Sequence, residues 1–332
     1  AVRDDAPRLA DAVAGLRAQR HLNARIVVID DRSRDATQQV LADAAAKDER
    51  LCVRTVHELP PQWLGKPHAL HTGAADATTR WLLFTDGDAR LAPDVVARTI
   101  AAAEREGAAH ACLLPNHRDT SLLGRAGLLA FQLTVQRRVA AVNRDRPGAF
   151  VGVGAFTLVR CDTYRAFGGH EALRLEVVDD VWLGALARRT GGRSRVWLAA
   201  DAFTIDWGST PGQLLRAVEK NMFAVLRYRT GLALAAIVGS TAVLAATAAL
   251  PIVTPYGWLT VGAYLATGVP GAALARRLGW ERLAGLFVPF ARVLLPLALL
   301  RSTVVTLRRG GVAWRGTFYP LAMLRQGQVP DR

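Results

Sequence analysis

Two aspartates separated by a single glycine, Asp86-Gly87-Asp88, directly follow the apolar segment 81–85. Magnesium and manganese ions are commonly held by one or two protein carboxylates together with phosphate oxygens and water. The glycine lets the backbone turn tightly beside such a ligand. The same triplet is also typical of a surface turn, because Asp and Gly are frequent turn residues. The triplet therefore indicates a metal site where other polar residues converge on it.

A second pair of carboxylates, Asp30 and Asp31, ends the β-branched segment 25–31. Two adjacent carboxylates repel each other unless hydrogen-bond donors or a ligand satisfy them. We expect Ser33 or Asp35 to cap the helix that begins near residue 35, since both residue types are preferred at that position. Capping explains these loop residues but not the adjacent pair, which indicates a ligand-binding site.

A third pair, Asp179 and Asp180, precedes the helical segment 181–189. Acidic residues suit a helix N-terminus, so helix capping is one interpretation. The other is a general base, for which one carboxylate must reach a hydroxyl group of the substrate. Lys66 stands in a loop before another expected helix, where its ammonium group can lie beside a diphosphate or point to solvent.

Short apolar segments alternate with helix-forming segments through the first half of the chain. Strands are expected at 25–31, 51–56, 81–85, 108–114 and 151–159, and helices at 35–47, 67–77, 93–106 and 121–143. This alternation is typical of an α/β fold with a mostly parallel sheet. Ligands bind at the carboxyl ends of such strands, and the first two carboxylate motifs both fall at strand ends.

The positive charge is concentrated near the C-terminal end of the chain, whose formal net charge is +14. Residues 1–210 contain 28 Lys and Arg against 25 Asp and Glu, whereas residues 211–332 contain 14 against 3. The long apolar runs lie in the same C-terminal part, and Arg at the edges of apolar segments is typical of a cytoplasmic membrane face. This distribution favours a membrane surface over nucleic acid as the partner.

Residues 232–253 contain no charged side chain, and about 20 such residues suffice to cross a bilayer. A second uncharged stretch covers 257–275 after a short break, so we predict a transmembrane hairpin over 232–275 with both ends in the cytoplasm. The segment 283–305 is also largely apolar, but it contains Arg292 and two prolines. We prefer an interfacial or re-entrant position for it over a third span.

The order of these motifs resembles that of the inverting glycosyltransferases of family 2, which have the GT-A fold. The matching elements cover about two thirds of the chain and are Arg3-Asp4-Asp5, Val28-Ile29-Asp30-Asp31-Arg32-Ser33, Trp63-Leu64-Gly65-Lys66, Asp86-Gly87-Asp88, Asp179-Asp180 and Gln213-Leu214-Leu215-Arg216. The first strand of that fold has no counterpart before Arg3, so we expect it upstream. The chain looks most similar to membrane-bound lipid glycosyltransferases of the hopanoid, carotenoid and ceramide type.

The resemblance implies how a UDP- or GDP-sugar donor is bound. Asp30 and Asp31 would contact its base and ribose, with Asp5 as a further substrate-binding residue. Asp88 would hold Mg²⁺ or Mn²⁺, and Asp86 would contact the metal or the ribose. These carboxylates form the donor side of the expected site.

The resemblance also implies the residues that act on the acceptor and the leaving group. Asp180 would be the catalytic base in a single displacement, while Asp179 shapes the site or caps the following helix. Lys66 or Arg216 would neutralise the departing diphosphate together with the metal.

Four further residues bear on the expected site, three of them through the same resemblance. Gln213 and Arg216 match the start of the Gln-x-x-Arg-Trp motif of membrane-bound members, but Ala217 replaces its tryptophan and argues against a polymer-gripping role. Gly152 is expected to keep a wall clear for the donor or acceptor. For His170, which follows two glycines in a loop that resembles one near the family's acceptor, we expect a structural role.

The sequence thus predicts a GT-A domain over 1–212, an amphipathic interfacial helix over 213–230 and a membrane region over 231–332. The expected protein is a multi-pass cell-membrane enzyme whose catalytic domain faces the cytoplasm, with a lipid-like acceptor and no nucleic-acid partner. One alternative is a polyprenyl-phosphate sugar synthase, whose acceptor phosphate needs no strong base. Another is a non-catalytic membrane subunit that binds a nucleotide sugar.

Overall fold

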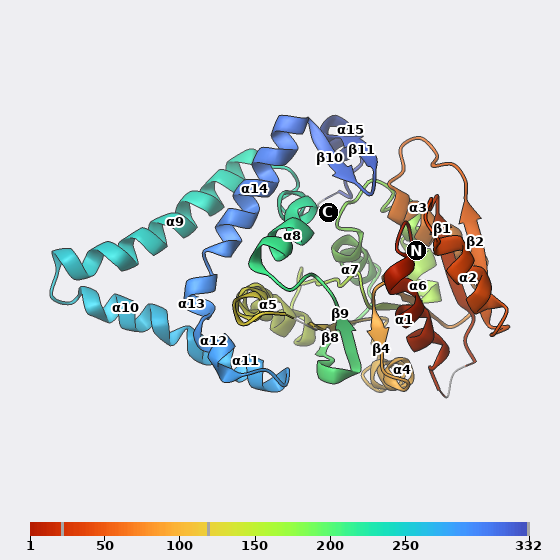
Figure 1. The fold of residues 1–332 in the computed structure, drawn as a ribbon, viewed down its shortest axis with the longest axis horizontal. Helices are drawn as coiled ribbons and strands as arrows, with labels where there is room; N and C mark the ends of the chain where they lie inside the picture. Colours follow the sequence, from red (N-terminus) through yellow and green to blue (C-terminus); the bar gives the residue numbers. More distant parts are fainter. Residues whose placement is uncertain (21–22, 118–119, 331–332) are drawn as a thin grey trace. The chain divides into compact units, whose positions relative to one another are not determined.

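The computed structural model describes residues 1–20, 23–117 and 120–330 (Figure 1). Its internal contacts divide the chain into two compact units, neither of which is continuous in sequence. The first unit contains Ala1–Asn116, Arg138–Ile205 and Gln326–Arg332, and the second contains His117–Arg137 and Asp206–Arg325. Helix α5 (Leu122–Asn143) begins in the second unit and ends in the first. The domain boundaries expected after residues 212 and 230 remain predictions.

The first unit contains a two-stranded parallel sheet near its N-terminus. Strand β1 (Ile26–Asp31) pairs with β2 (Leu51–Val56), and both coincide with expected strands. The backbone of Val2 forms a parallel bridge to Asp30 of β1. Helices α1 (Ala6–Arg17) and α2 (Thr37–Ala45) contribute Leu9 and Leu41 to the apolar core that also contains Val28. Packing in this core fixes the position of β1 and therefore of the two aspartates at its C-terminal end.

A four-stranded sheet with the order β3-β7-β5-β8 forms the centre of the first unit. The strands are β3 (Trp81–Phe84), β5 (His110–Leu114), β7 (Thr157–Arg160) and β8 (Ser194–Leu198). Strand β8 is parallel to β5, whereas β7 is antiparallel to both β3 and β5. The expectation of a mostly parallel sheet is therefore wrong, and the sheets are mixed. Apolar patterning identifies a strand but not its direction, and β7 enters between its neighbours from the opposite end.

Most helices of the first unit lie close to their expected positions. They are α3 (Gly65–Ala74), α4 (Val95–Arg105) and α7 (Asp179–Arg189), whereas α6 (Cys161–Ala166) was not predicted. Helix α4 buries Val95, Thr99 and Ala103, whose spacing of four residues places them on one face. The short strands β4 (Arg90–Leu91) and β9 (Phe203–Ile205) pair antiparallel, and β6 (Asn116–His117) spans the boundary between the units along the chain. The strand expected over 151–159 is shorter than predicted, because residues 151–156 form a loop.

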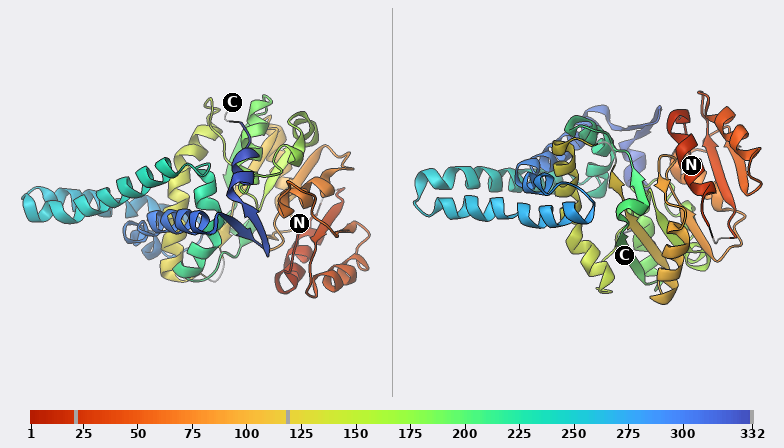
Figure 2. Two further views of the ribbon diagram at one scale, coloured as in Figure 1. Left: turned by 90° about the horizontal axis from the view of Figure 1, so that it is seen from above. Right: turned by 60° about the horizontal axis from the view of Figure 1, so that its bottom comes forward.

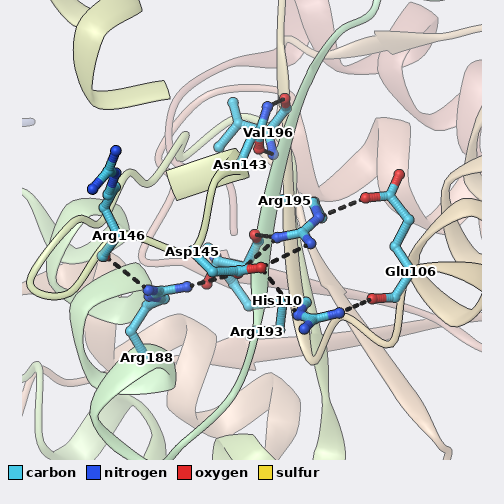
Figure 3. A network of polar contacts seen from close by, with 10 residues as sticks. Glu106, His110, Asn143, Asp145, Arg146, Arg188, Arg193, Arg195 and Val196 are labelled. Carbon is cyan, nitrogen blue, oxygen red and sulfur yellow. Dashed lines mark hydrogen bonds and ion pairs between the residues drawn. The ribbon is translucent and has the colours of Figure 1, made fainter. Parts of the chain in front are cut away.

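A network of charged side chains surrounds Asp145 in the first unit, as Figure 3 shows. Its carboxylate accepts hydrogen bonds from Arg188 and Arg195 and lies 3.3 Å from Nε of Arg193. Arg195 also donates from Nε to Glu106 at 2.5 Å. The hydrogen bond from Arg195 is the main reason that the pKa of Asp145 lies below its usual range. These contacts tie β8 to the residues that follow α4 and α5.

The second unit consists mainly of helices. Helix α8 (Pro211–Val225) packs along α14 (Leu294–Arg309), where Ser302 accepts a hydrogen bond from the backbone N–H of Phe223. Helices α9 (Thr230–Val253) and α10 (Gly257–Ala266) lie side by side as a hairpin, which the right-hand view of Figure 2 shows. The remaining elements are α11 (Gly268–Arg277), α12 (Arg282–Leu286), α13 (Val288–Ala291), β10 (Gly311–Trp314), β11 (Thr317–Pro320) and α15 (Leu321–Gln326).

Among the described residues of the second unit, three helical segments are long and apolar enough to cross a membrane, namely Thr230–Val253, Gly257–Arg277 and Val288–Arg309. Large apolar side chains point outward from them; Val238 and Ile252 of α9 are 64% and 85% exposed. Soluble monomers rarely expose contiguous apolar surface on this scale. The first two segments contain the predicted hairpin 232–275. The third contains most of the segment 283–305, for which an interfacial position stays a prediction.

Candidate active site

Asp86 and Asp88 follow β3, at the strand end where the sequence predicts a metal site. Burial raises the pKa of Asp88 to about 6, and the neighbouring carboxylates of Asp86 and Asp5 contribute to the same shift. A carboxylate in such surroundings is stabilised by a nearby cation. At Gly87 a Cβ atom would lie 2.7 Å from Cγ1 of Val2, so the glycine is required by close packing.

Lys66 lies in the first turn of α3, with its ammonium group among three of the predicted carboxylates. Its Nζ is 2.7 Å from Oδ1 of Asp86 and 4.0 Å from Oδ1 of Asp179. Burial opposes the charge of Lys66, but attraction to Asp179, Asp86 and Asp180 outweighs burial and raises its pKa above the usual range. Lys66 therefore stays positively charged and links the end of β3 to the first turn of α7.

Asp180 is held at the start of α7 by two glycines of the loop 151–156. Its Oδ2 accepts a hydrogen bond from the backbone N–H of Gly154 at 2.6 Å. A Cβ atom at Gly152 would lie 1.8 Å from the carbonyl oxygen of Asp180, so no larger residue fits there. Within the described ranges, Oδ1 of Asp180 receives no hydrogen bond from the protein. This geometry fixes the direction of the Asp180 carboxylate through one of its two oxygens.

Asp179, the first residue of α7, is only 4% exposed. Its Oδ2 lies 3.9 Å from Nε2 of His170, and its Oδ1 faces Lys66. His170 is fully enclosed, and Nδ1 of its ring is 2.8 Å from the hydroxyl oxygen of Tyr164. Burial lowers the pKa of His170 to about 3, so its ring is neutral at physiological pH.

The carboxylates at the end of β1 have partners close by in the chain. Asp30 is 0% exposed and accepts hydrogen bonds from the backbone N–H of Ser33 and from Nε2 of Gln38. Asp31 accepts two hydrogen bonds from the Arg32 guanidinium, at 2.7 and 3.1 Å. A Cβ atom at Gly65 would lie 2.4 Å from Oδ2 of Asp31, which places the start of α3 directly against this pair.

The loop after β1 corrects one expectation about helix capping. Helix α2 begins at Thr37 with Ala36 as its N-cap, so neither Ser33 nor Asp35 occupies that position. Asp35 instead accepts the N–H of Thr37 in a local turn, and Ser33 accepts the N–H of Asp4. Asp35 also accepts the N–H of Ala6 at 3.2 Å, so both side chains hold the N-terminal segment. Short polar side chains can form such bonds with nearby backbone groups.

Asp5 lies in that N-terminal loop, directly before α1. It is almost fully buried, and its backbone N–H donates to Oγ1 of Thr37 at 3.1 Å. Its carboxylate contributes to the raised pKa of Asp88, so the structure brings these two predicted site residues together. A nucleotide contact for Asp5 stays a prediction.

Gln213 and Arg216 belong to α8 in the second unit. Gln213 forms a capping box with Thr210, accepting the N–H of Thr210 while its own N–H donates to the Thr210 hydroxyl. Arg216 is exposed one helical turn later. The capping box gives Gln213 a structural function that the sequence motif did not reveal. Donor contacts for both residues stay predictions from the family resemblance.

The oxygen ligands of Asp86 and Asp88 fit a magnesium or manganese ion that keeps phosphate and water ligands. No group of three or more His, Cys, Asp or Glu side chains that could hold a metal ion occurs in the part of the chain that the structure describes. Two carboxylates would leave the remaining coordination positions of such an ion to phosphate oxygens and water.

Two contacts of Asp179 and Asp180 were not predicted from the sequence. The backbone N–H of Gly154 carries no side-chain signal, since only the fold brings it to Asp180. The Tyr164–His170 pair had a signal in the two glycines before His170, both of which adopt positive φ. Sequence reasoning assigned His170 a structural role and did not connect it to Asp179.

Solved structures that align with the chain include a mannosyltransferase, PcManGT from Pyrobaculum calidifontis, in complex with GDP-Man and Mn²⁺. That alignment covers 89% of this chain and 85% of the mannosyltransferase, at 17% sequence identity and a TM-score of 0.49. Another is S. aureus TarS 1–349 in complex with UDP, aligned over 68% of this chain and 63% of that one, at 13% identity and a TM-score of 0.45. A search of the curated proteins finds no match.

Comparison with protein-family models matches residues 2–168 to glycosyl transferase family 2. The matched segment includes Asp31, Lys66 and Asp88 and ends before Asp179. It covers about half of the chain, and the α/β fold with its mixed sheets agrees with the family. The chain belongs to glycosyl transferase family 2 and is a glycosyltransferase.

Proposed function

We propose that the protein transfers a sugar from a UDP- or GDP-sugar to a hydroxyl group of a lipid-like acceptor at the membrane surface, with inversion at the anomeric carbon. One observation supports this reaction most directly. A Cβ atom at Gly154 would lie 3.0 Å from Nζ of Lys66 and 3.3 Å from Oδ2 of Asp180. A cation suited to a departing diphosphate and a base suited to an incoming hydroxyl thus flank one small residue.

Asp180 acts as the general base. It takes the proton of the acceptor hydroxyl as the acceptor oxygen bonds to the anomeric carbon, while the bond from that carbon to the phosphate oxygen breaks. The nucleoside diphosphate leaves with the electron pair. The hydrogen bond from the N–H of Gly154 to Oδ2 fixes the orientation of the Asp180 carboxylate before the substrate binds, so the base is preorganised for the reaction.

Lys66 serves the leaving group, since its charge is maintained by three carboxylates and its side chain remains partly exposed. A divalent ion at Asp86 and Asp88 supplies additional positive charge to the diphosphate when it is bound. We assign the nucleotide contact to Asp31 and Asp5. Asp30, whose oxygens already accept from Ser33 and Gln38, acts through the shape of the loop.

The exposed apolar helices of the second unit support a membrane location and a lipid-like acceptor. We propose that 232–275 spans the bilayer with the catalytic unit facing the cytoplasm, because the surrounding segments are rich in Arg. The protein is then expected to stay in the membrane fraction when it is washed with about 1 M salt, which screens the attraction between surface charges. Only detergent should release it. Release by salt alone would show attachment through surface charge.

The acceptor class is tested with detergent-solubilised protein, a panel of UDP- and GDP-sugars, and two lipid acceptors. One acceptor carries a free hydroxyl, and the other is a polyprenyl phosphate. Transfer to the hydroxyl lipid, abolished by Asp180→Asn, supports the proposal. Transfer confined to the phosphate acceptor, with activity kept in Asp180→Asn, would contradict it, because a phosphate needs no strong base.

A further inference from the structure

Both the ring and the backbone N–H of His170 contact one hydroxyl group, that of Tyr164. Tyr164 lies in α6, and Gly168 and Gly169 lead from α6 into the 3₁₀ turn Gly169–Glu171. Both glycines have positive φ, and a Cβ atom at Gly169 would lie 2.8 Å from the Tyr164 ring. A left-handed backbone of this kind disfavours larger residues. The glycine pair therefore brings His170 into contact with Tyr164.

The hydrogen bonds of Tyr164 determine which nitrogen of His170 carries the proton. The Tyr164 hydroxyl oxygen accepts the backbone N–H of His170 at 3.0 Å, so its own proton is free to donate elsewhere. The ring nitrogen Nδ1 of His170 lies 2.8 Å away and accepts that proton. A neutral imidazole with Nδ1 as acceptor has its hydrogen on Nε2. His170 is thus held as the Nε2–H tautomer.

The Nε2–H group faces a buried carboxylate. It lies 3.9 Å from Oδ2 of Asp179 and forms no hydrogen bond among the described residues. A hydrogen bond forms at about 3 Å, so a movement of roughly 1 Å closes the gap. The His170 ring packs edge-on against Phe84 of β3 with ring centroids 4.6 Å apart, which restricts it to this direction.

Two neighbours of Asp179 can stabilise its charge. The ammonium group of Lys66 lies 4.0 Å from Oδ1 of Asp179, and Nε2 of His170 lies 3.9 Å from Oδ2. Lys66 also serves the diphosphate in the proposed reaction, and any movement toward the donor takes positive charge away from Asp179. A buried carboxylate that loses a counter-charge is costly unless a hydrogen-bond donor compensates.

We propose that Tyr164 and His170 form a positioning relay that stabilises Asp179 when Lys66 turns to the donor diphosphate. This inference rests on the proposed function. Tyr164 fixes the tautomer of His170, whose Nε2–H then points to Asp179. When Lys66 moves away, Asp179 replaces its ion pair with Lys66 by a hydrogen bond from His170. The hydrogen bond from His170 lowers the free-energy cost of moving Lys66 away from Asp179. Donor binding is therefore stronger, although neither Tyr164 nor His170 contacts the donor.

The first test measures binding of UDP and GDP in Mn²⁺ to the detergent-solubilised full chain. Tyr164→Phe keeps the ring and removes the hydroxyl, and we expect it to weaken binding about fivefold, as for one lost neutral hydrogen bond. His170→Leu is expected to weaken binding more. His170→Gln supplies an amide N–H near the position of Nε2 and is expected to recover much of the loss.

Coupling to Asp179 separates the relay from a merely structural contact. In an Asp179→Asn background the buried charge is gone, so Tyr164→Phe is expected to leave nucleotide affinity unchanged. Tyr264→Phe is the matched control, because its hydroxyl donates to the carbonyl of Pro289 in the second unit. The relay is wrong if Tyr164→Phe weakens binding equally in the wild type and in Asp179→Asn.

The tautomer is tested by ¹⁵N NMR of the full chain labelled at its seven histidines, with His170 assigned from His170→Gln. The relay requires the Nε2–H form in the wild type and its loss in Tyr164→Phe; an Nδ1–H form in the wild type overturns it. Failure of the proposed function looks different, since then the wild type binds neither UDP nor GDP in Mn²⁺ although its tautomer is as expected.

Discussion

The carboxylates at the end of β1 and those around Lys66 look alike in the sequence but have different surroundings. Asp30 and Asp31 are matched by the local donors of Ser33, Gln38 and Arg32. The other cluster consists of Asp86, Asp179 and Asp180, which share the positive charge of Lys66, and of Asp88, which lies beside Asp86. The first cluster is complete within the protein, whereas the second has an excess of negative charge that a bound cation would offset.

This difference indicates how a carboxylate pair can be assigned to structure or chemistry. A pair that accepts hydrogen bonds from its own loop stabilises that loop, and in the proposed function only Asp31 of this pair also contacts the nucleotide. A cluster that shares one lysine has capacity for a metal ion and for a proton from a substrate. Substitutions in the two clusters should therefore differ: those at the end of β1 should lower stability, and those around Lys66 should lower transfer or metal-dependent binding.

The largest effect is expected at Asp180. Asp180→Asn keeps the size of the side chain and removes the base, so the transfer rate should fall by about 10²- to 10⁴-fold. Affinity for the nucleoside diphosphate should stay near the wild-type value, because Asp180 serves the acceptor. Asp179→Asn should be milder. Retained activity in Asp180→Asn, or a larger loss in Asp179→Asn, would contradict the assignment of the base.

The second effect concerns stability at the β1 end. Asp30→Ala leaves the N–H of Ser33 and the amide of Gln38 without their buried acceptor, so the free energy of unfolding should fall by about 3 kcal/mol. Asp43→Ala, an exposed change on α2, should alter stability by about 0.5 kcal/mol or less. The measurement is thermal unfolding in detergent. A stable Asp30→Ala protein that no longer binds nucleotide would assign Asp30 to the ligand instead.

The third and smallest effect concerns Asp88, whose replacement is expected to raise the free energy of unfolding. Burial raises the pKa of Asp88 from 3.8 to about 6, so the folded state binds more protons than the unfolded state between these pH values. Stability therefore falls as pH rises through this window, and the full penalty applies above pH 6. Asp88→Asn should stabilise the protein by roughly 1 to 2 kcal/mol at pH 8 in chelator, with no gain at pH 3.5. Destabilisation at pH 8 would show that Asp88 has a stabilising partner.

The sequence predicted those elements that depend on local patterning. Strands β1 and β2 and helix α5 lie close to their expected positions, because a β-branched run and a long helical period are strong local signals. The direction of β7 was not predictable, since strand direction depends on which neighbours the strand joins in the folded sheet. The N-cap of α2 was misassigned because Ser33 accepts the N–H of Asp4 and Asp35 accepts the N–H of Ala6, both in the N-terminal segment.

The candidate site was predictable in its residue types but not in its connections. The carboxylates and Lys66 appear in the sequence as motifs, and the fold brings Lys66 to Asp86. The N–H of Gly154 on Asp180 and the Tyr164–His170 pair beside Asp179 depend on tertiary contacts between distant segments. No spacing rule within one segment of chain could have revealed them.

The central claim is that Asp86 and Asp88 bind a nucleoside diphosphate through a divalent metal ion. It is tested most directly by thermal unfolding of the full chain in detergent with a panel of nucleoside diphosphates, in Mn²⁺ and in chelator. The account predicts stabilisation by UDP or GDP in Mn²⁺, about 2.7 kcal/mol at a ligand concentration 100 times the dissociation constant. The stabilisation should largely disappear in chelator and in Asp88→Ala. Absence of stabilisation by every nucleotide, or equal stabilisation of the wild type and Asp88→Ala in Mn²⁺, would contradict the account.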